Sequence, residues 1–297
     1  MDGQESVTVR AFQAEAMLAR WRRRFATAPW AAAAELAARG GYMARGVVYL
    51  SVGLIALLAL LGLAPRTHGA LGALAAWARW PPGVVLLWLI GIGLCGFAGW
   101  RALQALFDAE GVGTAPKALA CRAGQALSGV IYGSLAVSVF GLIDTLHDLR
   151  RPAELEHTRD QVAAVMAWPL GPKLVMGLGL FVIGCGIGNA VRAFVEDFGS
   201  AFRCGPEARA IARRLARLGY FGRGLAMLPV GFSMLAAGWH ERAAEARDVG
   251  AALWALHAQG LGDLILALVA AGLAAFGAFG FVEAWRRPIR PEAALRS

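Results

Sequence analysis

Residues 39–46 have the sequence Arg39-Gly40-Gly41-Tyr42-Met43-Ala44-Arg45-Gly46, and residues 217–224 repeat it almost intact as Arg217-Leu218-Gly219-Tyr220-Phe221-Gly222-Arg223-Gly224. A fainter copy lies between them, Arg122-Ala123-Gly124-Gln125-Ala126-Leu127-Ser128-Gly129. Each copy opens a long apolar run, and the copies begin 83 and 95 residues apart. One unit of about a third of the chain is therefore used three times, so we expect a tandem-repeat fold.

The composition places these units in a membrane. Of the 297 residues, 58% are hydrophobic, and the mean hydropathy is +0.55, which leaves too much apolar surface for an ordinary soluble domain. A membrane-spanning helix needs roughly 20 apolar residues. Six stretches qualify, at 46–64, 83–100, 124–143, 174–191, 224–239 and 260–282. The sequence predicts an all-α integral membrane protein with six transmembrane helices.

Basic residues predict the orientation of these helices. The segments 1–45, 101–123, 192–223 and 283–297 contain 21 of the 29 Lys and Arg residues, so both termini are expected to face the cytoplasm. Membrane topology and attraction to anionic lipid are sufficient to explain the formal net charge of +9. We therefore expect no nucleic-acid partner. An Arg-rich, Lys-poor chain without an evident cleavable signal indicates a multi-pass protein of the bacterial cytoplasmic membrane.

The repeat divides the chain into five segments. Repeats of two transmembrane helices cover 36–110, 111–205 and 206–287, between a basic N-terminal segment, 1–35, and a cytoplasmic tail, 288–297. Residues 8–26 fit either a basic amphipathic helix on anionic headgroups or a frayed tail. Interfacial helices are expected at 72–77, 161–168 and 249–254. Because the three hairpins are inserted in the same sense, we expect them to pack around a pseudo-threefold axis along the membrane normal.

This arrangement resembles the bacterial domain-of-unknown-function 1206 family, which is built from three tandem two-helix units that open with an Arg-x-Gly-Tyr-x-x-Arg-Gly type signature. The signature is complete at 39–46 and 217–224, whereas the middle copy keeps Arg122, Gly124 and Gly129 but has Gln125 and Ser128. The resemblance covers residues 36–287. It implies a multi-pass bacterial membrane protein and no chemistry, because the family has no established activity.

Small residues mark the first helix of each unit, in pairs seven positions apart: Gly46 and Gly53, Gly129 and Ala136, Gly224 and Gly231. Seven residues make two helical turns, so each helix presents a smooth stripe that another backbone can approach closely. The run Gly91-Ile92-Gly93-Leu94-Cys95-Gly96 matches a dinucleotide-binding fingerprint. It lies inside a predicted span with no strand before it, so we interpret its glycines as packing surface too.

A polar face accompanies each small-residue stripe. Tyr42, Arg45 and Tyr49 share one face, with equivalents at Gln125, Ser128 and Tyr132 and at Tyr220, Arg223 and Met227. Under one hypothesis these faces converge on a cytoplasm-facing pocket for an anion, with the arginines as bidentate donors. Under the other, the arginines snorkel to lipid phosphate and the tyrosines belong to the interfacial belt.

The candidate ligand-binding or lipid-binding residues are accordingly Tyr42, Arg45, Tyr220, Arg223, Arg39, Arg122 and Arg217. Carboxylates close each unit and are expected to pair with the last three of these arginines; they are Asp108, Glu110, Glu196, Asp197 and Glu283. Such pairs would fasten the hairpins to one another.

Catalytic and metal chemistry find little support. The five histidines are scattered through the predicted outer segments without a ligand spacing, so no metal site is predicted. The sequence contains no Walker loop, nucleophile elbow or paired intramembrane carboxylate, so we expect neither an enzyme nor a cofactor.

Two classes of function remain. The first is a non-enzymatic membrane scaffold that binds anionic lipid or partner proteins through its basic inner face. The alternative is a channel or transporter for a small solute or ion, with a pathway between the three hairpins. The partner that the sequence predicts is the lipid bilayer, with anionic lipid at the cytoplasmic face, and it identifies no protein partner.

Overall fold

The computed structural model describes residues 30–64, 69–78, 80, 82–108, 113, 115–147, 157–198, 205–247, 251 and 262–286. These residues are predominantly helical and contain no strand. Six long helices are α2 (Trp30–Leu60), α4 (Gly83–Phe107), α5 (Pro116–His147), α7 (Gly171–Val195), α8 (Pro206–Trp239) and α10 (Gly262–Arg286). Three short ones are α3 (Gly69–Trp77), α6 (His157–Met166) and η1 (Ala243–Glu245).

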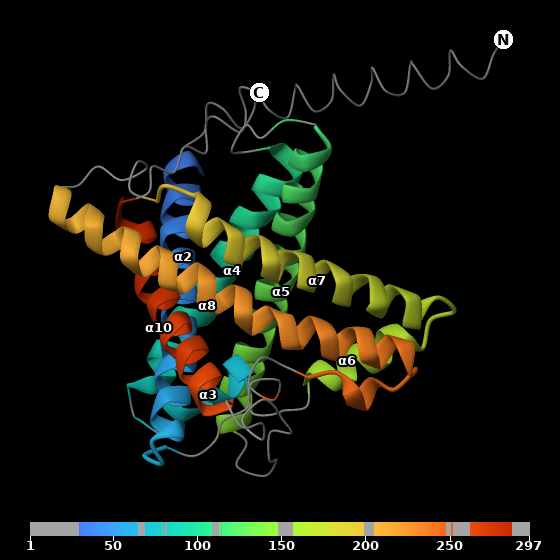
Figure 1. Ribbon diagram of the computed structural model, residues 1–297. Coiled ribbons are helices and arrows are strands. Elements are labelled where there is room, and N and C mark those ends of the chain that lie inside the picture. The colour runs from blue at the N-terminus through green and yellow to red at the C-terminus, as the bar shows by residue number, and fades with distance from the viewer. Residues whose placement is uncertain are drawn as a thin grey trace.

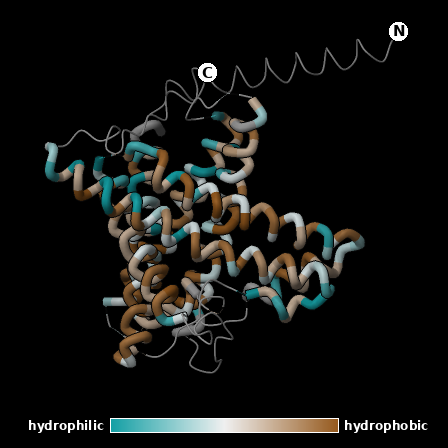
Figure 2. The backbone as a smooth tube through the Cα atoms, viewed as in Figure 1, coloured by the Kyte–Doolittle hydropathy of each residue, from teal (hydrophilic) through white to brown (hydrophobic). Residues whose placement is uncertain are grey.

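All six long helices are long and apolar enough to cross a membrane, which confirms the predicted all-α, multi-pass architecture. Figure 2 shows hydrophobic residues over much of their length, and hydrophilic residues near the start of α8. Most helices extend beyond the predicted spans, because polar residues of the repeated segment are already helical. The first helix instead ends early, at Leu60. Gly62, with a φ of +71°, and Leu63 donate backbone hydrogen bonds to Ala59 and Leu58, a Schellman stop.

The long helices pack as an open row. Closely packed pairs are α4 with α5, α2 with α4, α2 with α10, α8 with α10, and α7 with α8. Figure 1 shows α7 and α8 side by side, running across the other long helices at a steep angle. The first and third repeats therefore form packed hairpins, whereas α5 and α7 of the second repeat are separated by a cleft of about 400 Å³.

Small residues make the contacts between different repeats, as their spacing predicts. A Cβ atom built on Gly46 in α2 would lie 2.9 Å from the carbonyl oxygen of Gly277 in α10. One on Gly224 in α8 would lie 2.6 Å from the carbonyl oxygen of Gly186 in α7. These spacings exclude a side chain, so the backbones are in direct contact. The predicted close approach is confirmed, and in each case the partner is the second helix of another repeat.

The same interface recurs between α5 and α4, where a Cβ on Gly129 would lie 3.4 Å from the carbonyl oxygen of Ala98. Gly93 and Gly96, from the run that matches the dinucleotide fingerprint, pack against backbone atoms of α2. They are packing positions, as the sequence indicates.

Short helices follow the first helix of two repeats, close to the predicted interfacial segments. Trp77, at the end of α3, donates a 3.0 Å hydrogen bond from Nε1 to Ser51 Oγ in α2, so this helix is fastened to the bundle. α6 covers most of the second predicted segment, and Trp168 just beyond it is exposed. Most of the third, 249–254, and the predicted amphipathic segment 8–26 lie outside the described residues.

Candidate functional site

Three arginines from three helices are joined by two phenylalanine rings in the interior of the bundle. The guanidinium carbon of Arg101 lies 5.0 Å from the centre of the Phe97 ring, and that of Arg45 lies 5.0 Å from the same ring. Arg45 and Arg223 both lie 4.9 Å from the centre of the Phe276 ring. Each ring therefore stabilises two guanidinium cations through its π-face. We call Arg45, Arg101 and Arg223 the arginine cluster.

Glycines of the repeated segment explain how the rings reach the centre. A Cβ on Gly41 would lie 2.7 Å from the Phe97 Cα, and one on Gly219 would lie 2.6 Å from the Phe276 Cα. The first helix of each of these repeats thus touches the backbone of the second at the phenylalanine. The arginine four residues after each glycine, Arg45 or Arg223, then lies against the ring.

All four tyrosines of the chain gather around this cluster. The Tyr132 hydroxyl donates a 3.1 Å hydrogen bond to the Tyr49 hydroxyl, and Arg223 lies 5.7 Å from the centre of the Tyr49 ring. Tyr42 packs edge-on against Phe97, and Tyr220 against Phe276. Faces from α2, α5 and α8 that share one register in the repeat therefore meet in space.

Charge in the cluster is unbalanced. Arg45, 2% exposed, forms an ion pair with Glu283 of α10, itself 3% exposed. Within the part of the chain that the structure describes, neither Arg101 nor Arg223 forms an ion pair with a carboxylate. Among the described residues, three guanidinium groups against one carboxylate leave a surplus of two positive charges.

Several polar atoms of the cluster and its surroundings lack a hydrogen-bond partner among the described residues. They include Nε of each of the three arginines, Gln125 Oε1 and Ser128 Oγ. Gln125 is 6% exposed. Buried polar groups are normally satisfied, so this concentration of unmatched donors and acceptors is typical of a site that takes a polar ligand.

The cluster lies toward one end of the predicted spans. Fifteen to eighteen residues separate its arginines from Leu60, Gly83 and Trp239 at the far ends of their helices, which is about 22–27 Å of helix. The hydrocarbon core is about 30 Å thick. The arginines therefore lie near the end of the spans at which the repeated signature stands.

Arg39 and Arg122, two other predicted site residues, lie outside the cluster and bind helix ends. Arg39 pairs with Glu35 and donates a 2.5 Å hydrogen bond to the Ala284 carbonyl oxygen of α10. Arg122 donates a 2.9 Å hydrogen bond to the Ala105 carbonyl oxygen of α4. Both cations thus stabilise the C-terminus of a neighbouring helix.

Arg217, the equivalent residue of α8, is exposed. Two of the unit-closing carboxylates pair with other arginines than predicted: Glu283 binds Arg45, and Glu196 binds Arg192 one turn away. Glu110 lies outside the described residues. Arg122 and Arg39 instead bind backbone carbonyl oxygens at the ends of α4 and α10.

Sequence reasoning missed Arg101 and Glu283 as members of the site. Both lie on second helices, whereas the repeated signature lies on first helices. Arg101 donates a 2.9 Å hydrogen bond to Gln104, which is 1% exposed. A buried glutamine next to an arginine near the end of an apolar span is the signal that could have identified this position.

Fold and cluster together define a six-helix membrane protein built from three two-helix units around a buried cationic centre. The Domain of Unknown Function family DUF1206 matches the chain three times, at residues 40–108, 123–196 and 218–287. The chain belongs to this family. It is 28% identical over 263 residues to the uncharacterized protein YxxB of Bacillus subtilis (strain 168), a match that covers 86% of this chain and 91% of the relative. No solved structure matches the chain.

Proposed function

We propose that this protein is a non-enzymatic membrane protein that binds an anionic group, a phosphate or a carboxylate, between Arg101 and Arg223. The surplus of two positive charges in the arginine cluster carries the proposal. Unpaired charge in an apolar, water-poor interior is costly, and charged groups inside membrane spans mark binding sites or pathways. An anion with one or two negative charges would neutralise the surplus.

The chemistry of the surrounding groups supports this ligand class. Guanidinium groups bind phosphate and carboxylate through two parallel N–H donors. The contacts with Phe97 and Phe276 do not use N–H donors, and Nε of Arg101 and of Arg223 has no partner among the described residues. The Ser128 hydroxyl, on the same face of α5 as Tyr132, has no partner among the described residues and adds a donor.

We also propose how the protein is placed in the cell. Both termini face the cytoplasm of a bacterium, and the membrane is the cytoplasmic membrane, as the distribution of basic residues favours. The three units are arranged about a pseudo-threefold axis, which is supported by the recurring contacts of Gly46, Gly129 and Gly224 with a helix of another unit. In this arrangement the protein is a scaffold whose inner face binds anionic lipid or partner proteins.

A thermal-shift experiment tests the site. Delipidated protein in neutral detergent is melted with inorganic phosphate, with phosphatidylglycerol in mixed micelles, and with phosphatidylcholine. A ligand that binds only the folded state stabilises it by about 2.7 kcal/mol at a concentration of 100 times Kd. We expect anions to raise Tm and phosphatidylcholine not to. The double variant Arg101→Gln/Arg223→Gln should lose this response, whereas Arg217→Gln, at an exposed basic position, should keep it.

The same experiment distinguishes a soluble anion from a lipid headgroup as the ligand. A response to phosphate and phosphatidylglycerol alike indicates a headgroup-sized site open to soluble anions, and a response to the lipid alone indicates a lipid site. If the double variant responds as the wild type does, the proposed site is refuted.

A solute pathway is the second candidate, because polar side chains of α2, α4, α5, α8 and α10 meet in the interior of the bundle. It differs from the first in predicting flux. Proteoliposomes should then show anion uptake that the same double variant abolishes, whereas a binding protein shows none.

A further inference from the structure

The three units differ at one interface, and the difference is local. In the first unit a Cβ on Gly93 of α4 would lie 2.9 Å from the Gly40 carbonyl oxygen of α2. In the third, a Cβ on Gly272 of α10 would lie 2.6 Å from the Gly222 Cα of α8. Both glycines precede the central phenylalanine by four residues, and each allows the two helices of its unit to touch.

Phe181 occupies the equivalent position of the second unit. The equivalence follows from the contacts between units, in which the carbonyl oxygen of one residue on each second helix faces the last glycine of a signature. These residues are Gly277, Ala98 and Gly186. Counting five residues back from each leads to Gly272, Gly93 and Phe181. A large aromatic side chain therefore stands in α7 where the other units have glycine.

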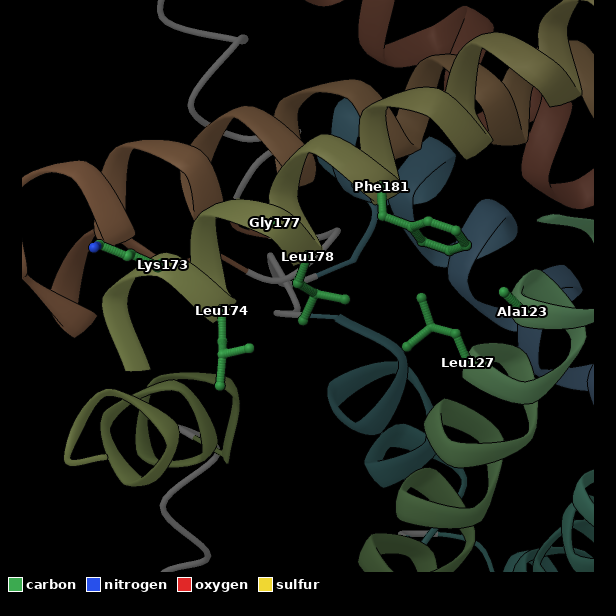
Figure 3. A pocket seen from close by; sticks show the side chains of 7 residues that line it. All are labelled: Ala123, Leu127, Lys173, Leu174, Gly177, Leu178 and Phe181. Carbon is green, nitrogen blue, oxygen red and sulfur yellow. The ribbon is translucent and has the colours of Figure 1, made fainter. Parts of the chain in front are cut away.

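The phenylalanine keeps α5 and α7 apart. In the other two units, the signature glycines Gly41 and Gly219 touch the backbone of the second helix, but a Cβ on Gly124 of α5 would meet only the tip of the Phe181 ring, at 3.9 Å. A cleft of about 400 Å³ lies here, lined by Ala123, Leu127, Lys173, Leu174, Gly177, Leu178 and Phe181. Figure 3 shows Phe181 and Leu178 of α7 across from Leu127 and Ala123 of α5.

The cleft is lined by apolar residues apart from Lys173, and it adjoins the polar site along α5. Leu127 is next to Ser128 in α5, and Gln125, with its unmatched Oε1, is two residues away. On α7, Phe181 is one turn before Cys185 and five residues before Gly186, which touches Gly224 of α8 next to Arg223. The volume lies within the range of ligand pockets, about 300–1,000 Å³. Because both helices span the membrane, the occupant of an apolar cleft between them comes from the bilayer.

We propose that the cleft between α5 and α7 seats one acyl chain of an anionic phospholipid while its phosphate binds the arginine cluster. This inference rests on the proposed function and names the ligand of that site as a lipid. The surplus positive charge selects an anionic headgroup, and the leucine and phenylalanine walls accept the chain. Phe181 is then the residue that gives one of three similar units an open side.

Filling the cleft tests the inference. Leu178→Trp adds bulk from α7, and Leu127→Trp does so from α5, which gives a second variant should the first misfold. The matched control is Leu180→Trp, in the same helix but 58% exposed and outside the cleft. Native mass spectrometry measures retained phosphatidylglycerol, and Tm measures the response to inorganic phosphate. Circular dichroism and gel filtration verify folding.

We expect the cleft variants to retain about tenfold less phosphatidylglycerol, with the phosphate response unchanged, and the control to match the wild type. Wild-type retention by both folded cleft variants would overturn the acyl-chain assignment while leaving the anion site intact. A separate failure is also distinguishable. If Arg101→Gln/Arg223→Gln changes neither lipid retention nor the phosphate response, the proposed function itself is wrong.

Discussion

Arg45 and Arg223 occupy equivalent positions in two repeats, yet their replacement should affect stability very differently. Arg45 is 2% exposed and paired with Glu283, which is 3% exposed. Arg45→Gln leaves this carboxylate buried without its cation, and breaking a buried ion pair costs about 3–5 kcal/mol. We therefore expect Arg45→Gln to lower the free energy of unfolding by about 3 kcal/mol or more.

Arg223→Gln removes a cation that has no carboxylate partner among the described residues. The variant loses two cation–π contacts, with Tyr49 and Phe276, worth about 0.5–2 kcal/mol each in a desolvated site. It also relieves repulsion from Arg45 and Arg101, which acts in the opposite direction. The net change in unfolding free energy in lipid-free detergent should be within about 1 kcal/mol of zero.

Reversible unfolding of the delipidated protein in mixed micelles that contain dodecyl sulfate measures the unfolding free energy of both variants. A double-mutant cycle of Arg45→Gln with Glu283→Gln should give a coupling energy of about 2 kcal/mol or more. The reasoning is refuted if Arg223→Gln destabilises the protein as much as Arg45→Gln does, because Arg223 would then have a structural counter-charge of its own.

Other predictions concern packing and helix ends. Gly224→Val should lower Tm by at least several degrees, because the new Cβ would lie 2.6 Å from a carbonyl oxygen. Gly188→Val is the control and should leave Tm unchanged, because no atom lies within 4 Å of its Cβ. Differential scanning fluorimetry measures both variants, and equal losses of Tm would contradict close packing at Gly224. Trp77→Phe should cost about 0.5–1.5 kcal/mol for one lost hydrogen bond, measured by unfolding in mixed micelles, and no loss would show that α3 is held without it. Arg39→Gln should lower Tm by removing bonds to the end of α10, while Arg217→Gln, exposed, should leave it unchanged.

Hydropathy and repetition were sufficient to predict the helices. An apolar run of about 20 residues has few alternatives to a membrane helix. Close approach at Gly46, Gly53, Gly224 and Gly231 was equally predictable, because a glycine stripe on a membrane helix is a contact surface. The partner of each stripe was not predictable. A glycine stripe can pack equally well against the second helix of its own unit and against the second helix of another unit.

The candidate site was predictable in part. The spacing of Tyr42 and Arg45, repeated at Tyr220 and Arg223, indicated converging faces under one of two hypotheses. These residues do meet around Phe97 and Phe276. The pairing of Arg45 with Glu283 was not predictable, because it joins positions 238 residues apart through the packing of α2 on α10.

In our proposal the opening of the second unit is attributed to Phe181, which stands where the other units have glycine. This role was not predictable from the sequence, because phenylalanine is an ordinary residue in an apolar span and the repeated signature does not include this position. Its effect becomes clear only when the contacts of Gly93 and Gly272 show what the equivalent position does elsewhere.

The central claim is that an anion binds between Arg101 and Arg223. A cryo-electron microscopy map of the protein in nanodiscs that contain phosphatidylglycerol tests it most directly. The account predicts density for a phosphate within about 3 Å of both guanidinium groups, with an acyl chain continuing between α5 and α7. Guanidinium groups that contact only protein side chains or water, with no density between them, would contradict it.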